Sequence, residues 1–173
     1  MSVTRRRSLA RCGAASPHVE MELVPLTGEA TRVANPDIWI TTDDQLVVAA
    51  LLEQALQGGR HLSAAIWLTN ELSRARIVPV AQVPPDCMTL YASGRYVDLN
   101  TRAIREATLV PVAGRSLRGV VSVLSENGAA LFGLRAGQTI RWRDTYGRAR
   151  ALELVELTHQ PERANHSPNS RRP

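Results

Sequence analysis

The sequence predicts an α+β fold, in which a short N-terminal antiparallel helical hairpin precedes an antiparallel sheet that carries one short helix. Apolar residues recur at three- and four-residue steps between residues 42 and 78, which is the period of amphipathic helices. After Pro84 and Pro85 the period changes to two, which is typical of strands. Helices that are followed by a run of strands indicate an α+β domain, with the sheet packed on helices.

The first helix is expected from Thr42 to about Gln57. Thr42 and Gln45 have the spacing of a capping box, in which each side chain bonds a free amide at the start of the helix. Gly58 and Gly59 end the pattern. One apolar stripe runs along this segment, formed by Val48, Leu51, Leu52 and Ala55.

The second helix is expected to begin at Ser63 and to end before Pro79, with Arg74 and Arg76 in its last turn, where cations suit the helix dipole. Its apolar face comprises Ala65, Leu68, Leu72 and Ala75. Two helices joined by a loop of about five residues pack antiparallel, so residues 42–78 are predicted to form a short hairpin, a small coiled coil.

Six segments after Pro85 alternate as strands do and are rich in Val, Leu, Ile, Thr or Tyr. One short helix interrupts them, capped by Ser125 and ended by Gly133. The predicted strands are Met88–Tyr91, Arg95–Leu99, Ala107–Val112, Gly119–Leu124, Gln138–Arg143 and Ala151–Thr158.

The predicted domain organisation has four parts. Residues 1–37 and 163–173 mix polar residues and arginine with proline and have no sustained apolar period, so they are expected to be a disordered N-terminal extension and a disordered tail. Residues 38–80 form the hairpin, and residues 81–162 form the sheet domain.

Composition excludes several classes of function. The net charge is +5, and all of the basic residues that contribute to it are arginines. They are spread along the chain, so no strong nucleic-acid-binding face is indicated. Cys12 and Cys87 lie 75 positions apart, which matches no metal site and favours a reduced cytoplasmic protein. The chain contains no run of 18 apolar residues, so no membrane span is predicted. The four histidines have no ligand spacing either, so neither metal nor cofactor is expected. They are His18, His61, His159 and His166.

Several short motifs agree in order and spacing with a known family over residues 39–162. They include residues 128–140, Leu51–Gln54 in the first helix, Asn70–Leu72 in the second, and Leu152–Leu157 in the last strand. In these the chain resembles the Rnk family of regulators of nucleoside diphosphate kinase, relatives of the GreA and GreB transcript cleavage factors.

The resemblance implies an FKBP-like C-terminal domain that docks on RNA polymerase near the mouth of its secondary channel, with the hairpin directed at the channel. It implies no enzyme activity and no small-molecule substrate, and it links the chain to regulation of nucleoside diphosphate kinase. The turn before the short helix contacts polymerase in the Gre relatives, usually as Ser-Pro or Ala-Pro. Here Ser125, Glu126 and Asn127 occupy that place, with Glu126 instead of proline.

The resemblance also directs attention to the tip of the hairpin, where Gre factors carry two carboxylates that help hold a catalytic Mg²⁺. The tip of this chain contains Gly58, Gly59, Arg60 and His61 and no acidic residue. The nearest acids, Glu53 and Glu71, are interpreted as solvated charges on the helix faces. We therefore expect the chain to occupy the channel entrance without stimulating RNA cleavage.

Two other functions stay open. An arginine-rich patch could contact nucleic acid, although a solvated sheet face is the favoured interpretation. Its members are Arg141, Arg143, Arg148 and Arg150. A prolyl isomerase of the FKBP type is less favoured, because that activity requires a pocket lined by aromatic residues, and Phe132 and Trp142 are better explained as core.

Overall fold

The computed structural model describes residues 35–59, 61–112 and 118–162. Both predicted disordered segments lie outside these ranges, apart from residues 35–37, and so does Arg60 at the predicted hairpin tip. The described residues belong to one compact unit.

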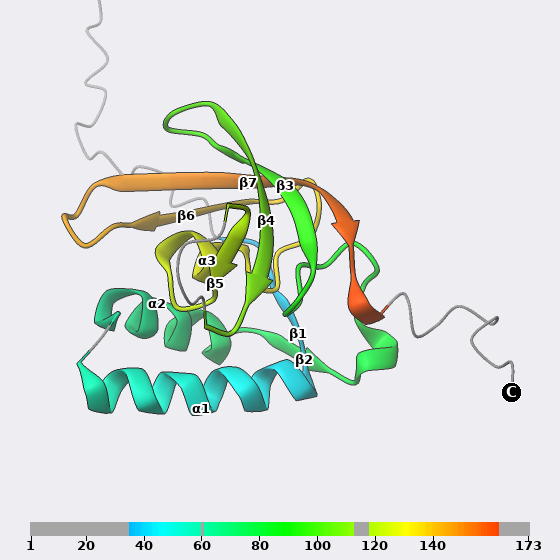
Figure 1. Cartoon of the computed structure of the whole chain (residues 1–173), viewed down its shortest axis with the longest axis horizontal. Coiled ribbons are helices and arrows are strands. Elements are labelled where there is room, and N and C mark those ends of the chain that lie inside the picture. The colour runs from blue at the N-terminus through cyan, green and yellow to red at the C-terminus, as the bar shows by residue number, and fades with distance from the viewer. Residues whose placement is uncertain (1–34, 60, 113–117, 163–173) are drawn as a thin grey trace, which may run out of the picture. The chain divides into compact units, whose positions relative to one another are not determined.

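Two antiparallel helices, α1 (Thr42–Gly58) and α2 (Leu62–Ser73), form the hairpin that the apolar periods predict (Figure 1). The predicted cap at Thr42 is wrong by one residue. Thr41 is the N-cap, because its backbone is extended and its hydroxyl accepts a hydrogen bond from the N–H of Asp44 at 3.0 Å. Thr42 is already helical.

The second helix is shorter than predicted, and Arg74 and Arg76 lie beyond its last turn. The chain extends instead into β2 (Arg76–Val78), which pairs in parallel with β1 (Trp39–Thr41). A single 3-10 turn, η1 (Val80–Gln82), follows. Three-residue strands are too short to show a period of two, so the alternation that reveals longer strands was missing here.

Five strands form the sheet, in the order β5-β4-β3-β7-β6. Their bounds are β3 (Ser93–Asp98), β4 (Ala103–Val110), β5 (Val120–Ser122), β6 (Thr139–Arg143) and β7 (Ala149–His159). The α+β class is confirmed, but the sheet is mixed rather than antiparallel, because β5 runs parallel to β4. Alternation of side chains shows that a strand is present but does not show its direction.

The predicted strand Met88–Tyr91 is wrong. It forms no strand ladder, because its amides bond to three different parts of the chain. The N–H of Met88 donates to the carbonyl of Leu134 at 2.9 Å, the N–H of Leu90 donates to Asp44, and the N–H of Tyr91 makes a single bond to the carbonyl of Leu109 in β4. Tyr91 then turns the chain with a φ of 65°. These contacts join the segment to α1 and to the loop after α3.

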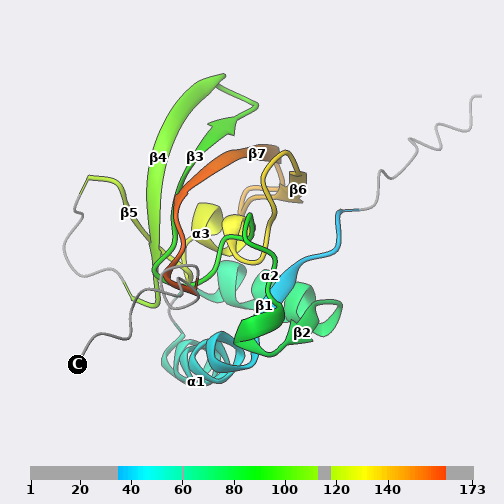
Figure 2. The ribbon, with the colours of Figure 1, turned by 90° about the vertical axis from the view of Figure 1, so that its right-hand side faces the viewer.

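The short helix α3 (Glu126–Leu131) lies between the sheet and the hairpin (Figures 1 and 2). One buried core joins all three layers: Val48 of α1 and Leu68 of α2 belong to the same cluster as Phe132 and as Leu154 of β7. The hairpin therefore lies along the body of the unit and is not a free prong. The coiled-coil packing stays an expectation from the apolar periods, and the FKBP-like topology stays an expectation from the resemblance.

Candidate functional site

The turn at Ser125 is held in place by two hydrogen bonds of one hydroxyl. Ser125 Oγ accepts from the N–H of Gly128 at 3.1 Å, which caps α3 as predicted, and donates to the carbonyl of Ser122 at 2.7 Å. Gly128 has no side chain, and a Cβ there would lie 1.9 Å from the same carbonyl. The start of α3 is thus pressed against the end of β5, which fixes the direction of the turn.

The next two residues connect this turn to the sheet. Glu126 Oε1 accepts from the N–H of Thr145 at 3.3 Å, in the loop between β6 and β7. The side chain of Asn127 lies near that of Tyr96, which is 3% exposed on β3. Burial raises the pKa of the Tyr96 phenol, and Arg105 partly offsets this. All three residues of the turn remain partly exposed, so a partner can reach them.

The hairpin tip turns through two residues with left-handed backbones. Gly59 (φ 64°) caps the end of α1, with its N–H bonded to the carbonyl of Ala55, and His61 (φ 56°) precedes α2. His61 has no side-chain capping bond and is exposed. The residues described at the tip carry no carboxylate.

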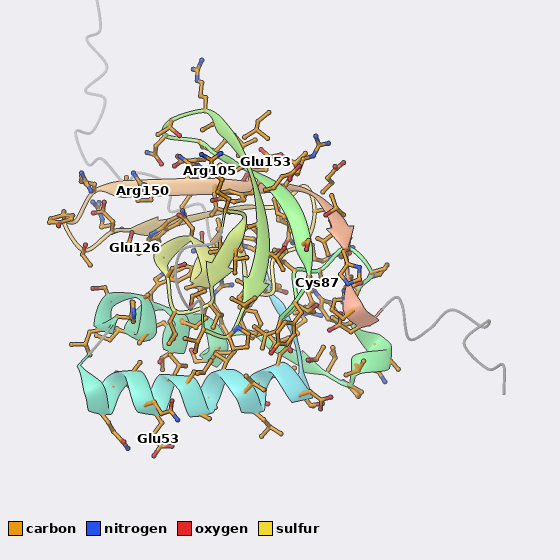
Figure 3. All side chains as sticks on the ribbon, viewed as in Figure 1. Glu53, Cys87, Arg105, Glu126, Arg150 and Glu153 are labelled. Atoms are coloured by element: carbon orange, nitrogen blue, oxygen red, sulfur yellow. The ribbon has the colours of Figure 1, made fainter. Side chains whose placement is uncertain are left out.

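A groove of about 780 Å³ separates the tip from the sheet and brings the two predicted contact elements together. Gly58 and His61 line it from the tip, and Ser125, Glu126 and Asn127 line it from the turn. Its remaining lining comes from α1, the inner face of the sheet and β5: Leu51, Gln54, Ala55, Tyr96, Arg105, Val112, Val120, Val121, Ser122, Leu124 and Arg150. A second hollow of about 430 Å³ also joins His61 to Ser125 and Glu126. Arg150 and Glu126 lie on the side of the molecule where the hairpin turns (Figure 3).

The four arginines of the predicted basic patch do not share one face. Arg141 and Arg143 alternate on β6 and are exposed, with the buried Trp142 between them. Arg150 of β7 lies directly opposite Trp142, so it belongs to the inner face and lines the groove. Arg148 is bonded to Asp144 at 2.8 Å. The outer face therefore presents Arg141 and Arg143 without the other two.

The acids of the hairpin differ from each other. Glu53 is exposed and points away from the body of the molecule (Figure 3), as expected for a solvated charge. The same expectation for Glu71 is wrong, because Glu71 is 5% exposed and is paired with Arg74. Arg74 also donates to the carbonyl of Pro36 at 2.6 Å, so the buried acid helps hold the segment before β1.

No cluster of three potential metal ligands occurs within the described ranges. His61 and His159 are exposed and lie at a loop and a strand end, and His18 and His166 fall outside those ranges. Nor does any helix in the described part of the chain have the length and apolar character to cross a membrane. Phe132 and Trp142 are buried in the core, as predicted. Among the described residues, Tyr96 is the one Phe, Tyr or Trp in the groove lining.

Sequence reasoning missed Tyr96 and Arg105, which face each other across β3 and β4. The alternation in these strands could have placed both on one face, but it could not reveal that this face meets the hairpin tip.

Comparison with known proteins adds a family context to this geometry. No family model matches the chain. It is 35% identical over 133 residues to the regulator of nucleoside diphosphate kinase of Escherichia coli K12, and this alignment covers 76% of this chain and 96% of the relative. The protein of the same name from Shigella flexneri gives the same values. Among solved structures, a GreA/GreB transcription elongation factor from Nitrosomonas europaea is similar with a TM-score of 0.51 and 26% identity, covering 72% of this chain and 100% of that one.

Proposed function

Because this chain belongs to the family of the regulator of nucleoside diphosphate kinase, which has a GreA/GreB-like fold, we propose that it is a regulatory protein that binds RNA polymerase. The proposed docking place is near the secondary channel, and the proposed contacts are the turn at Ser125, Glu126 and Asn127 and the hairpin tip at Gly58 to His61. The proposed regulator does not stimulate transcript cleavage by the polymerase.

One observation carries the proposal: the turn and the tip, which lie more than sixty positions apart in the sequence, border the same groove. A single partner surface can therefore contact both at once. The hydrogen bonds of Ser125 hold the turn in one conformation, which lowers the entropy that is lost on binding.

The chemistry of the tip supports regulation without cleavage. Stimulated cleavage through a second Mg²⁺ needs oxygen ligands at the tip, and neither of the two acids nearest the tip supplies one. Glu53 lies more than one helical turn before the end of α1, and Glu71 is buried against Arg74. A helix of 17 residues is also only about 25 Å long. Because the hairpin lies along the body, its reach beyond the body is shorter still.

The test uses the purified full chain and core RNA polymerase at low salt. Binding that a Gre factor displaces, with no acceleration of RNA cleavage in stalled elongation complexes, is the expected result. Failure to bind would overturn the proposal, and stimulated cleavage would overturn its second half. The same binding measurement with purified nucleoside diphosphate kinase distinguishes direct contact with the kinase from control through transcription.

A further inference from the structure

We propose that the groove between the hairpin tip and the Ser125 turn receives a segment of the polymerase that presents a carboxylate beside an apolar side chain. Arg105 and Arg150 bind the carboxylate, and the walls from α1 and β5 cover the apolar side chain. This inference rests on the proposed function and specifies the chemistry of the partner segment.

Two arginines project from the inner face of the sheet into the groove. Arg105 of β4 is paired in register with Tyr96 of β3, so both side chains lie on the same face. Asp98 lies two residues after Tyr96 and therefore on the same face, and it is paired with Leu152 of β7. Arg150 precedes Leu152 by two residues, which places Arg150 on that face as well. Both arginines line the groove.

These guanidinium groups are poorly neutralised within the described residues. The side chain of Arg105 makes no ion pair or hydrogen bond there, and Arg150 makes one ion pair, with Asp98 at the long distance of 3.8 Å. Other arginines have closer partners: Arg95 lies 2.6 Å from Glu156, and Arg135 bonds both oxygens of Asp86 at 2.9 Å. Like Arg105, four other arginines have no ion pair within the described residues, but none of the four lines the groove: Arg102, Arg118, Arg141 and Arg143. A guanidinium fork fits a carboxylate well, so the two groove arginines are available for an anionic group.

The opposite walls of the groove are apolar. Leu51 and Ala55 come from α1, and Val120, Val121 and Leu124 come from β5 and the residues after it. Val112 lies at the groove with 61% of its surface exposed. Burial of apolar surface here supplies affinity. The charged contacts orient the segment and exclude other partners.

The charge around the groove favours one carboxylate over a dense polyanion. Among the described residues, Glu126 also lines the groove and Asp98 lies near Arg150, so the excess positive charge at the two arginines is small. A polyphosphate carries several negative charges and would be repelled by Glu126. A single carboxylate can pair with the arginines while the apolar residue beside it packs on the apolar wall. A protein segment is also long enough to contact the turn and the tip together across the groove.

The experiment measures the affinity of the full chain for core RNA polymerase with R105E/R150E and with a matched control. The control, R141E/R143E, makes the same change of charge at exposed positions of the outer face. We expect R105E/R150E to weaken binding by about tenfold or more, and the control to stay close to wild type. Val112→Ser should weaken binding less than R105E/R150E, since it removes apolar area only. Thermal unfolding of each variant confirms that the fold is intact.

The outcomes separate this inference from the function on which it rests. If wild type does not bind polymerase, the proposed function fails and the inference fails with it. If wild type binds and both double variants bind equally well, the inference alone fails. The third outcome is that the groove binds a small anionic ligand. In that case ATP binds the isolated chain, R105E/R150E abolishes ATP binding, and the same variant binds polymerase as tightly as wild type does. This result would overturn the inference.

Discussion

The carboxylate of Asp44 accepts a hydrogen bond from the backbone N–H of Leu90 at 3.1 Å, which joins the first turn of α1 to the segment before the sheet. Asp44 is 8% exposed. Burial raises the pKa of its carboxyl from the ordinary value of 3.8 to about 6, and the nearby negative charge of Glu162 adds to this rise. A buried acid thus connects the two parts of the unit and titrates near neutral pH.

The pKa of Asp44 predicts a specific pH dependence of stability. Because the folded chain holds this proton more tightly than the unfolded chain, the contribution of Asp44 to stability is fully present below pH 3.8 and is lost as the pH rises through about 6. The free energy of unfolding of wild type relative to Asp44→Asn should therefore fall with rising pH, by on the order of 3 kcal/mol in total. Urea unfolding of both proteins across this range measures the difference.

The exposed neighbour Asp43 supplies the control for that measurement. Asp43→Asn should follow the pH dependence of wild type closely, since it leaves the buried carboxyl in place and removes only the smallest of the charges that raise its pKa. A difference between wild type and Asp44→Asn that does not change with pH would show that Asp44 does not titrate as described.

The contact between α3 and β5 depends on Gly128. A Cβ at this position would lie 1.9 Å from the carbonyl oxygen of Ser122, and backbone atoms cannot move away cheaply. Gly128→Ala should lower the free energy of unfolding by about 2 kcal/mol or more. Gly58→Ala is the matched control, because no atom lies within 4 Å of its added Cβ and the residue is helical. It should change stability by less than about 1 kcal/mol, in the stabilising direction. Equal unfolding midpoints for the two variants would contradict the described packing.

Glu126→Pro should fold normally and bind polymerase more tightly. Glu126 is the first residue of α3, where proline is well accommodated, and its N–H makes no hydrogen bond with the described residues. Ser125 before it already has the extended backbone that proline requires, with a φ of −90° and a ψ of 157°. Affinity measured in parallel for Glu126→Ala shows whether a gain comes from proline itself. Weaker binding by Glu126→Pro with an intact fold would count against the role of this turn.

Cys87 should be unreactive in the folded protein. Its side chain is 0% exposed, and burial raises the pKa of the thiol to about 12, so the reactive thiolate is almost absent at neutral pH. In a Cys12→Ser background, a maleimide should label Cys87 only after denaturant is added. Rapid labelling of the native protein would indicate that the core around Cys87 opens readily.

Local signals in the sequence predicted the elements whose geometry is set by neighbouring residues. The cap at Ser125 and the glycine turn at Gly133 follow from hydrogen bonding and backbone freedom over a few positions, and the structure shows both. The apolar stripe of α1 likewise predicted that Val48 and Leu52 are buried.

Features that depend on distant parts of the chain could not be predicted in this way. The parallel direction of β5 and the pairing of β1 with β2 join segments whose own patterns carry no information about the partner. The burial of Glu71 depends on Arg74 and on the chain near Pro36. The groove exists because the hairpin packs along the body, so Tyr96 and Arg105 became visible as site residues only in three dimensions.

Site-specific crosslinking tests the central claim most directly. A photoreactive probe at Glu126 in the full chain, mixed with core RNA polymerase, should form a covalent adduct with a polymerase subunit, and excess unlabelled chain should suppress it. The control is the same probe at Ile104, which is 70% exposed and lies outside the groove. The account predicts an adduct at Glu126 well above that at Ile104. An equal yield at the two positions, or none at either, would contradict docking through this turn.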